Sequence, residues 1–148
     1  MSSIVNMIPY VVVKGGEAAI AFYKAAFGAT EIFRLTDPSD KRIGHAELRI
    51  GDSVLMLADE YPDFGAVSPD TIGGTAVTFH LATRNVDDDL AAAGRAGATV
   101  LRPATDQSFG ERTALVLDPF GHRWMLSQRI EEVTPDEMQQ RWEQGTSA

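Results

Sequence analysis

The sequence predicts an α+β fold in which two βαβββ units, each forming a mixed sheet, are followed by a C-terminal helix. A predicted helix ends at Gly28 and another at Gly97, and 97 minus 28 gives an offset of 69 residues. The same offset relates Met56 to Met125, each inside an apolar strand pattern. A repeat this long indicates a duplicated supersecondary unit rather than a short-period solenoid.

The first unit is predicted to span residues 7–58. β-Branched and aromatic residues favour a strand at its start, and Gly15 and Gly16 separate that strand from an apolar-periodic helix. Gly28 then supplies a left-handed helix cap. The pair Gly51-Asp52 is typical of a two-residue hairpin. The predicted strands lie at 8–13, 30–36, 43–50 and 53–58.

The second unit is predicted to span residues 76–128. A helix is expected at 86–96, with Asp87, Asp88 and Asp89 in its first turn, where carboxylates favour the helix dipole. The predicted strands lie at 76–82, 99–103, 112–117 and 122–128. Asp118-Pro119-Phe120-Gly121 favours a type I turn with a glycine bulge before the last strand.

Two further segments complete the predicted organisation as a single domain over residues 1–148. The connector at 59–75 is rich in Gly, Pro and Asp, and a connector of this length is often functional. A C-terminal helix is predicted at 131–145, since Thr134-Pro135-Asp136-Glu137 fits a capping box. Met138 and Trp142 share one face of that helix, which we expect to dock on its own fold or on a partner.

Composition narrows the functional classes. The formal net charge of -8 argues against nucleic acid as a partner, because phosphate repels an acidic surface. The absence of cysteine excludes disulfides, thiolate metal sites and cysteine nucleophiles. No apolar run approaches the ~20 residues that span a bilayer, and the N-terminus lacks the pattern of a signal peptide. The sequence therefore predicts a cytoplasmic protein without a membrane partner.

Several motifs, taken in order, resemble the vicinal-oxygen-chelate superfamily of glyoxalase, bleomycin resistance and dioxygenase proteins. The motifs are Gly44 to Asp52, Phe109 to Arg112, Asp118 to Trp124, and Glu131 to Met138, and together they are similar to the PhnB-like branch. The resemblance implies two curved four-stranded sheets with helices outside, each enclosing a concave small-molecule site. It also implies a homodimer.

The positions that correspond to the superfamily's metal ligands carry no suitable side chain here. The resemblance places these ligands at Ile8 (or Pro9), Met56, Thr78 and Met125. Thioethers are soft ligands, and a lone threonine hydroxyl is a poor anchor for zinc, nickel, iron or manganese. We therefore expect no metal and no cofactor, and glyoxalase or dioxygenase chemistry that depends on a Lewis acid is disfavoured.

Strand alternation predicts which side chains line the first sheet. A two-residue turn at Gly51-Asp52 places Glu47 opposite Met56 and Arg49 opposite Val54, with His45 on the same face. Tyr10 is expected to face the same way.

The same argument applies to the second sheet. The bulged turn places Met125 opposite Leu115, with Thr113 on that face, while Thr78 and His80 share the corresponding face of their own strand. Arg112 would point away unless the strand starts irregularly, so it is a weaker candidate.

Three hypotheses about function follow. In the first, a metal-independent enzyme, a lyase, isomerase or transferase, uses Glu47 as general base and His80 or His45 as acid, with Arg49 binding an anionic substrate. In the second, the chain sequesters a small molecule without catalysis. In the third, His45, Glu47 and His80 form an atypical metal site. A purely structural role for His45, Glu47 and His80 is the competing interpretation.

Overall fold

The computed structural model describes residues 1–146 and divides them into two compact units. The first comprises Met1–Thr75 together with Pro119–Gly121, and the second comprises Ala76–Asp118 and the residues from His122 onward. The predicted α+β fold class, with two four-stranded mixed sheets and a C-terminal helix, is confirmed.

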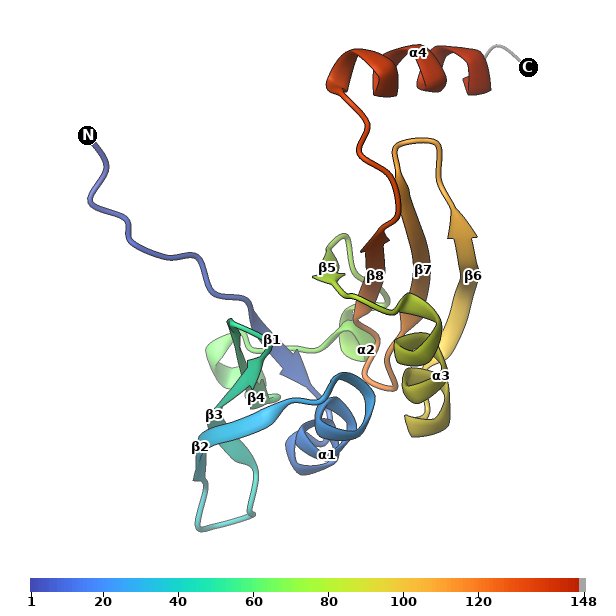
Figure 1. The fold of residues 1–148 in the computed structure, drawn as a ribbon. Helices are drawn as coiled ribbons and strands as arrows, with labels where there is room; N and C mark the ends of the chain where they lie inside the picture. The colour runs from blue at the N-terminus through green and yellow to red at the C-terminus, as the bar shows by residue number, and fades with distance from the viewer. Residues whose placement is uncertain (147–148) are drawn as a thin grey trace. The chain divides into compact units, whose positions relative to one another are not determined.

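The first unit is a four-stranded sheet with one long helix (Figure 1). Its strands are in the order β1-β4-β3-β2, and only the β1–β4 pair is parallel. The connector that follows is partly ordered into two short helical turns, η1 and α2. The elements are β1 (Tyr10–Val13), α1 (Gly16–Phe27), β2 (Thr30–Thr36), β3 (Ile43–Ile50), β4 (Ser53–Asp59), η1 (Pro62–Phe64) and α2 (Pro69–Ile72).

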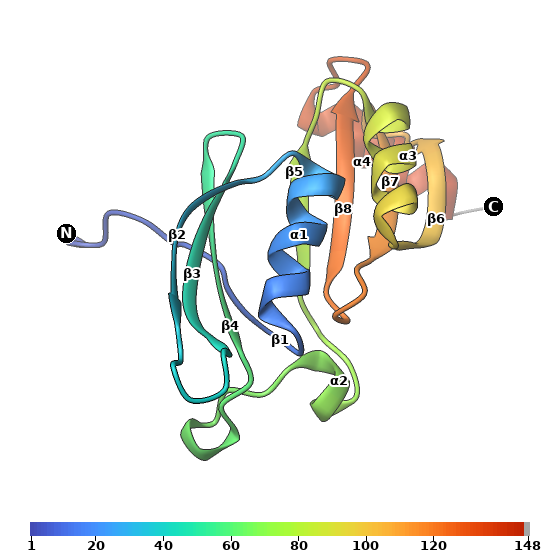
Figure 2. The same cartoon turned by 90° about the horizontal axis from the view of Figure 1, so that it is seen from below.

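The second unit repeats this topology, with the strand order β5-β8-β7-β6 and a parallel β5–β8 pair. Figure 2 shows α3 lying over one face of this sheet, beside β7 and β6. The elements are β5 (Thr78–Ala82), α3 (Val86–Ala96), β6 (Thr99–Asp106), β7 (Glu111–Leu117), β8 (Arg123–Arg129) and α4 (Pro135–Thr146).

Several element boundaries differ from the sequence prediction, and β5, for example, begins at Thr78 rather than at residue 76. β1 begins at Tyr10 rather than at residue 8, since Pro9 has no N–H and contributes only its carbonyl, which accepts from Met56 N at 3.0 Å. β6 continues to Asp106, which pairs with Arg112. The C-terminal helix begins at Pro135 rather than 131, because Thr134 Oγ1 accepts from Glu137 N at 3.2 Å and so caps it.

The last strand of each unit caps the helix of that unit. Asp59, at the end of β4, is buried and accepts hydrogen bonds from the backbone N–H groups of Gly15 (2.9 Å), Gly16 (2.7 Å) and Ile43 (2.7 Å). Gln128 on β8, 69 residues later (128 minus 59), accepts from Val86 N at 3.0 Å. Orphan amides at both helix starts are thereby satisfied from the sheet.

Close packing at this cap requires glycine. A Cβ on Gly16 would lie 2.7 Å from Asp59 Oδ2 and 2.7 Å from Ile43 Cγ1. Both neighbours belong to the buried network that orders the start of α1, so neither has room to move.

In each unit, one face of the sheet is buried and the other is left open by that unit's own elements. Alternate sheet residues form the buried cores with apolar helix residues such as Ile20 and Tyr23 of α1 and Ala93 of α3. The apolar sheet residues in these cores include Val11, Val13, Ala46, Leu48, Leu55 and Leu57 in the first unit, and Ala114, Val116, Trp124 and Leu126 in the second.

The hairpin between β7 and β8 has the predicted bulged turn. Gly121 has a positive φ of 91°, and Asp118 N donates to the His122 carbonyl at 2.8 Å. The Asp118 carboxylate also accepts from His122 N and from Trp124 Nε1, both at 2.9 Å. The turn is therefore fixed by a buried carboxylate as well as by its glycine.

The expected docking of the C-terminal helix is only partly made within the chain. Met138 and Trp142 remain 37% and 65% exposed. Arg141 holds α4 instead, since its guanidinium donates to Glu131 Oε1 at 2.6 Å and to the Ser108 carbonyl at 2.9 Å. Docking of this face on a partner stays a prediction.

Over residues 1–146, no helix combines the length and the apolar character needed to cross a bilayer.

Replacing Asp59 with asparagine will lower the free energy of unfolding by about 3 kcal/mol, because the new amide group opposes backbone N–H donors that stay buried. Chemical denaturation of Asp59→Asn measures this loss. Asp52→Asn, in the exposed β3–β4 turn, is the matched control and should change stability by less than about 0.5 kcal/mol. Equal effects of the two substitutions would contradict the capping role.

The Glu31–Arg34 ion pair gives a pH-dependent contribution to stability. Hydrogen bonds from Arg34 at 2.8 Å lower the pKa of Glu31 to about 2. A lowered carboxyl pKa stabilises the fold above the unfolded pKa of about 4.3, and this contribution disappears as pH falls through about 2. Glu31→Gln will therefore cost on the order of 1 kcal/mol at pH 7, allowing for solvent screening of a surface pair, and little at pH 2.

Thermal unfolding from pH 7 to pH 2 checks this, with Arg34→Gln and the double variant completing a mutant cycle. A Glu31→Gln penalty that does not shrink toward pH 2 would refute the assignment.

Candidate functional site

The open face of the first sheet brings together the side chains that the sequence analysis selected there. The register pairs Glu47 with Met56 and Arg49 with Val54, which confirms both predicted pairings. Tyr10 of β1 pairs with Met56 on the other side of β4. Alternation then places Tyr10, His45, Glu47, Arg49 and Met56 on one face, opposite the buried residues that pack on α1.

Three of these residues form a continuous hydrogen-bonded chain. Tyr10 Oη lies 2.8 Å from His45 Nδ1, and His45 Nε2 lies 2.9 Å from Glu47 Oε2. His45 and Glu47 are two residues apart on β3, so their side chains stand side by side, and β1 supplies the tyrosine through the intervening β4. The sequence identified all three residues but not the bonds between them.

With a neutral imidazole and an ionised carboxylate, the two hydrogen bonds of His45 fit one arrangement of protons. An ionised Glu47 carboxylate can only accept, so His45 carries its hydrogen on Nε2. Nδ1 of the neutral imidazole is then the acceptor for the Tyr10 hydroxyl hydrogen. The phenol oxygen keeps its lone pairs for another donor.

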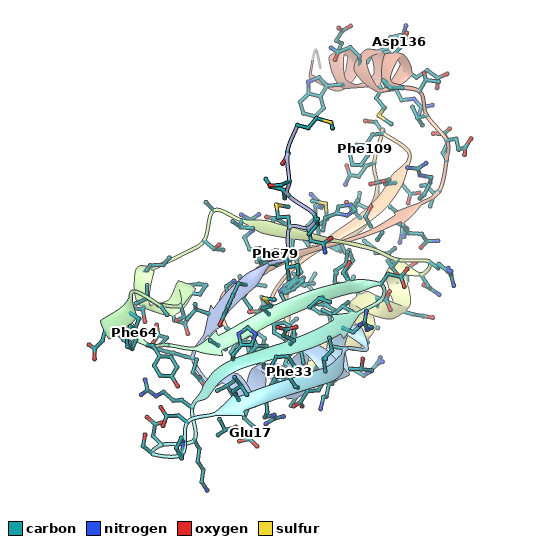
Figure 3. The ribbon with its side chains drawn as sticks, turned by 90° about the vertical axis from the view of Figure 1, so that its left-hand side faces the viewer. Glu17, Phe33, Phe64, Phe79, Phe109 and Asp136 are labelled. Atoms are coloured by element: carbon teal, nitrogen blue, oxygen red, sulfur yellow. The ribbon has the colours of Figure 1, made fainter. Side chains whose placement is uncertain are left out.

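Apolar and aromatic groups surround this chain. The Phe33 ring lies 5.7 Å from the His45 ring, and the Tyr10 ring contacts the same imidazole edge-on at 5.2 Å. Phe33 is the β2 neighbour of Glu47, and Figure 3 shows it on the outer strand of this sheet. Burial raises the pKa of Tyr10, and the negative charge of Glu47 raises it further, so the phenol stays protonated at neutral pH.

The open face of the second sheet has different chemistry. Leu115 pairs with Met125, as predicted, and His80 is the β5 neighbour of Met125. The predicted Thr113 is fully buried, and its Oγ1 accepts from Arg102 Nη2 at 2.7 Å and Gln107 Nε2 at 3.2 Å. Thr113 therefore positions other side chains and offers no exposed surface to a ligand.

A carboxylate that sequence reasoning missed lies beside His80. Ser127 Oγ donates to Glu111 Oε2 at 2.6 Å, and His80 Nε2 is 4.0 Å from the same oxygen. Arg102 and Gln107 were missed as well. Because side chains alternate along a strand, Ser127 and Glu111 could have been predicted to share the face of Met125. The face that Arg102 occupies could not, because β6 contains register shifts.

The family assignment follows from a match over most of the chain. The model of the Glyoxalase/Bleomycin resistance protein/Dioxygenase superfamily matches residues 4–126. This chain belongs to that superfamily.

Similar proteins support the assignment. An uncharacterized protein of Mycobacterium bovis is 43% identical over 134 residues, which cover 88% of each chain. The X-ray structure of the Arabidopsis thaliana At5g48480 product has 26% identity and a TM-score of 0.65, covering 86% of this chain and 99% of that one. TioX from Micromonospora, with a TM-score of 0.67, 24% identity and the same 86% coverage (100% of its own chain), shows the fold alone.

The superfamily's metal chemistry does not fit the residues present. The sheet register places Tyr10, rather than Ile8, beside Met56, and His80, rather than Thr78, beside Met125. A thioether occupies the last-strand position in both units, where a hard metal ion needs oxygen or nitrogen ligands. Among residues 1–146, no three His, Asp or Glu side chains converge on a position that would hold a metal ion.

The contacts of Arg112 argue against a role in substrate binding. Its β8 neighbour is Gln128, which faces α3, and its guanidinium donates to Asp87 Oδ1 at 3.0 Å and Asp106 Oδ1 at 2.9 Å. Strand alternation had indicated that it points away, and its two carboxylate partners give the physical reason to exclude it.

The hydrogen-bonded chain predicts a measurable coupling between Glu47 and Tyr10. Removing the carboxylate charge in Glu47→Gln will lower the pKa of Tyr10, while burial, the larger cause, keeps it above its ordinary value. NMR titration of ¹³Cζ-labelled tyrosine measures this shift, with Tyr10→Phe assigning the signal. An unchanged or higher pKa in Glu47→Gln would contradict the coupling.

Proposed function

We propose that this superfamily member is a metal-independent enzyme that binds a small molecule on the open face of the first sheet and removes a proton from it. The single observation that carries the proposal is the chain of hydrogen bonds from Tyr10 through His45 to Glu47. A histidine oriented by a carboxylate and bonded to a hydroxyl is the arrangement that activates an otherwise weak base.

We assign the roles differently from the sequence hypothesis, in which Glu47 was the base. Glu47 bonds to His45, so it orients the imidazole and stabilises its charged form. Tyr10 Oη is the outermost atom of the chain, and we assign it the contact with substrate. As Tyr10 takes the substrate proton, its own proton passes to His45 Nδ1.

Simultaneous transfer of the two protons avoids a free Tyr10 tyrosinate as an intermediate. A free tyrosinate is disfavoured because burial and Glu47 both raise the pKa of Tyr10. Passing the phenolic proton to His45 at the same time forms an imidazolium next to the Glu47 carboxylate instead, and that pair is mutually stabilised. Arg49, on the same face of β3, supplies positive charge for an anionic substrate or for the charge left by the lost proton.

The reaction classes that fit are isomerisation and elimination, both of which begin with loss of a proton. The rim of Phe33 and Met56 favours a substrate with an apolar part. The PhnB-like branch, a homodimer and a cytoplasmic location belong to the same proposal, as predictions from the sequence.

A sequestering protein without catalysis is the second candidate. The observation that favours it is the apolar and aromatic surface around His45, which would hold a ligand by burial alone. Such a protein retains its affinity when the charge of Glu47 is removed, and it forms no product.

Deuterium exchange tests the proposal without knowledge of the substrate. Pooled libraries of small carbonyl and carboxyl compounds, incubated with the protein in D₂O, will yield at least one compound with a protein-dependent mass gain. Glu47→Gln will reduce its rate of exchange by about 10²–10⁴-fold. Glu17→Gln, at the exposed start of α1, is the matched control and will exchange at the wild-type rate.

Full exchange by Glu47→Gln would refute the proposed relay. Ligand-dependent thermal stabilisation of both variants, without exchange or product, would establish the sequestering function instead.

A further inference from the structure

We infer that the open face of the second sheet binds the oxyanion group of an apolar small molecule, a carboxylate or a phosphate, with Arg102 as the anchoring cation. The inference rests on the proposal that the chain binds a small molecule. It names the chemical class of a small molecule that the second sheet binds and the side chain that holds its charged group.

One row of four residues crosses this sheet. The register places Arg102 of β6 beside Leu115, Leu115 beside Met125, and Met125 beside His80. Neighbouring strands lie about 4.8 Å apart, so the Cα atoms of Arg102 and His80 are separated by about 14 Å. The row is an apolar floor of Leu115 and Met125 with a polar side chain at each end.

Neutral groups, and no acid, position the Arg102 side chain. Its Nη2 donates to the fully buried Thr113 Oγ1 at 2.7 Å, and Gln107 Nε2 donates to the same oxygen at 3.2 Å. Its Nε is buried without a hydrogen-bond acceptor. Over the described residues, Arg102 forms no ion pair with a carboxylate, unlike Arg112, which is bonded to two.

A second arginine on this face is also without an acid partner. Arg123 lies two residues before Met125 on β8, and its buried Nε has no acceptor among the described residues. Glu111 lies at the His80 end of the row, with its Oε2 4.0 Å from His80 Nε2, and it is bonded to Ser127. In a chain of net charge -8, two half-buried guanidinium groups without carboxylates make this face locally cationic.

A planar guanidinium held at one nitrogen presents its remaining N–H groups as a fork, which matches a carboxylate or phosphate in two parallel hydrogen bonds. The Leu115–Met125 floor suits a ring or a short acyl chain attached to that anion. His80, at the far end of the row, would meet a polar group at the other end of the ligand.

Binding of three probes to the wild-type protein tests the inference directly. Benzoate, phenyl phosphate and benzylamine share an aromatic ring and differ in charge. We expect benzoate or phenyl phosphate to shift the NMR signals of the Met125 methyl group and the Leu115 and Arg102 amides, with benzylamine binding at least tenfold more weakly. The tighter anion identifies the class. Equal binding of all three probes, or shifts confined to other residues, would overturn the inference.

Matched variants separate the guanidinium from bulk charge. Arg102→Gln will weaken binding of the preferred anion at least tenfold, and Arg102→Lys will recover part of that loss because it keeps the charge but not the fork. Arg95→Gln, in the exposed last turn of α3, removes the same charge and will leave the affinity within twofold of wild type. Equal losses in Arg95→Gln and Arg102→Gln would refute a specific site.

This test stands apart from catalysis. Glu47→Gln, which removes the proposed proton relay on the other sheet, will bind the probe with wild-type affinity. Intact anion binding with no proton exchange would therefore refute the proposed enzyme and leave this site in place, and the reverse result would refute this site alone.

Discussion

The buried carboxylate of Asp59 is the interaction on which the first unit depends. It joins the end of β4 to the start of α1, more than 40 residues earlier, and to the first amide of β3, and thus links three elements. Because the amides at a helix start have no partners within the helix, an acceptor supplied by the sheet fixes where the helix lies. One face of the sheet is consequently buried under α1, and the other presents Tyr10, His45 and Glu47.

In the second unit, a side chain of the last strand also caps the helix, but it is an amide rather than a carboxylate. Gln128 takes the place of Asp59 and caps α3 with a neutral side chain, assisted by Asn85, whose side chain accepts from Asp88 N at 3.1 Å. A neutral amide suffices there since Asn85 supplies a second acceptor, whereas the N-cap of α1 is Gly15, which has no side chain to offer. The duplicated scaffold therefore tolerates a change of cap chemistry without a change of topology.

The two open faces diverge on this common scaffold. At the position beside the last-strand methionine, the first unit has Tyr10 and the second has His80. Opposite the same methionines, the first unit has Glu47 and the second has Leu115. The first face therefore carries a polar hydrogen-bonded chain with aromatic neighbours, and the second carries an apolar floor beside Arg102 and Arg123. With methionine at both positions, the functions that we propose rely on side-chain acids, bases and cations.

The sequence by itself determined the order of the strands and of α1, α3 and α4, the duplication and two antiparallel registers. Gly51-Asp52 and the turn at Asp118 to Gly121 specify their hairpins locally, because turn geometry fixes which residues pair, and the pairs Glu47–Met56 and Leu115–Met125 follow from that alone. Only the tertiary structure decided that Tyr10 lies beside Met56 and bonds to His45, since parallel pairing of β1 with β4 involves no turn between them. It also decided that Arg102 is held by Thr113 rather than by an acid, because bulges in β6 change which face a side chain occupies. Local turn chemistry is encoded in a few adjacent residues, whereas these contacts depend on segments that meet only after the sheet has formed.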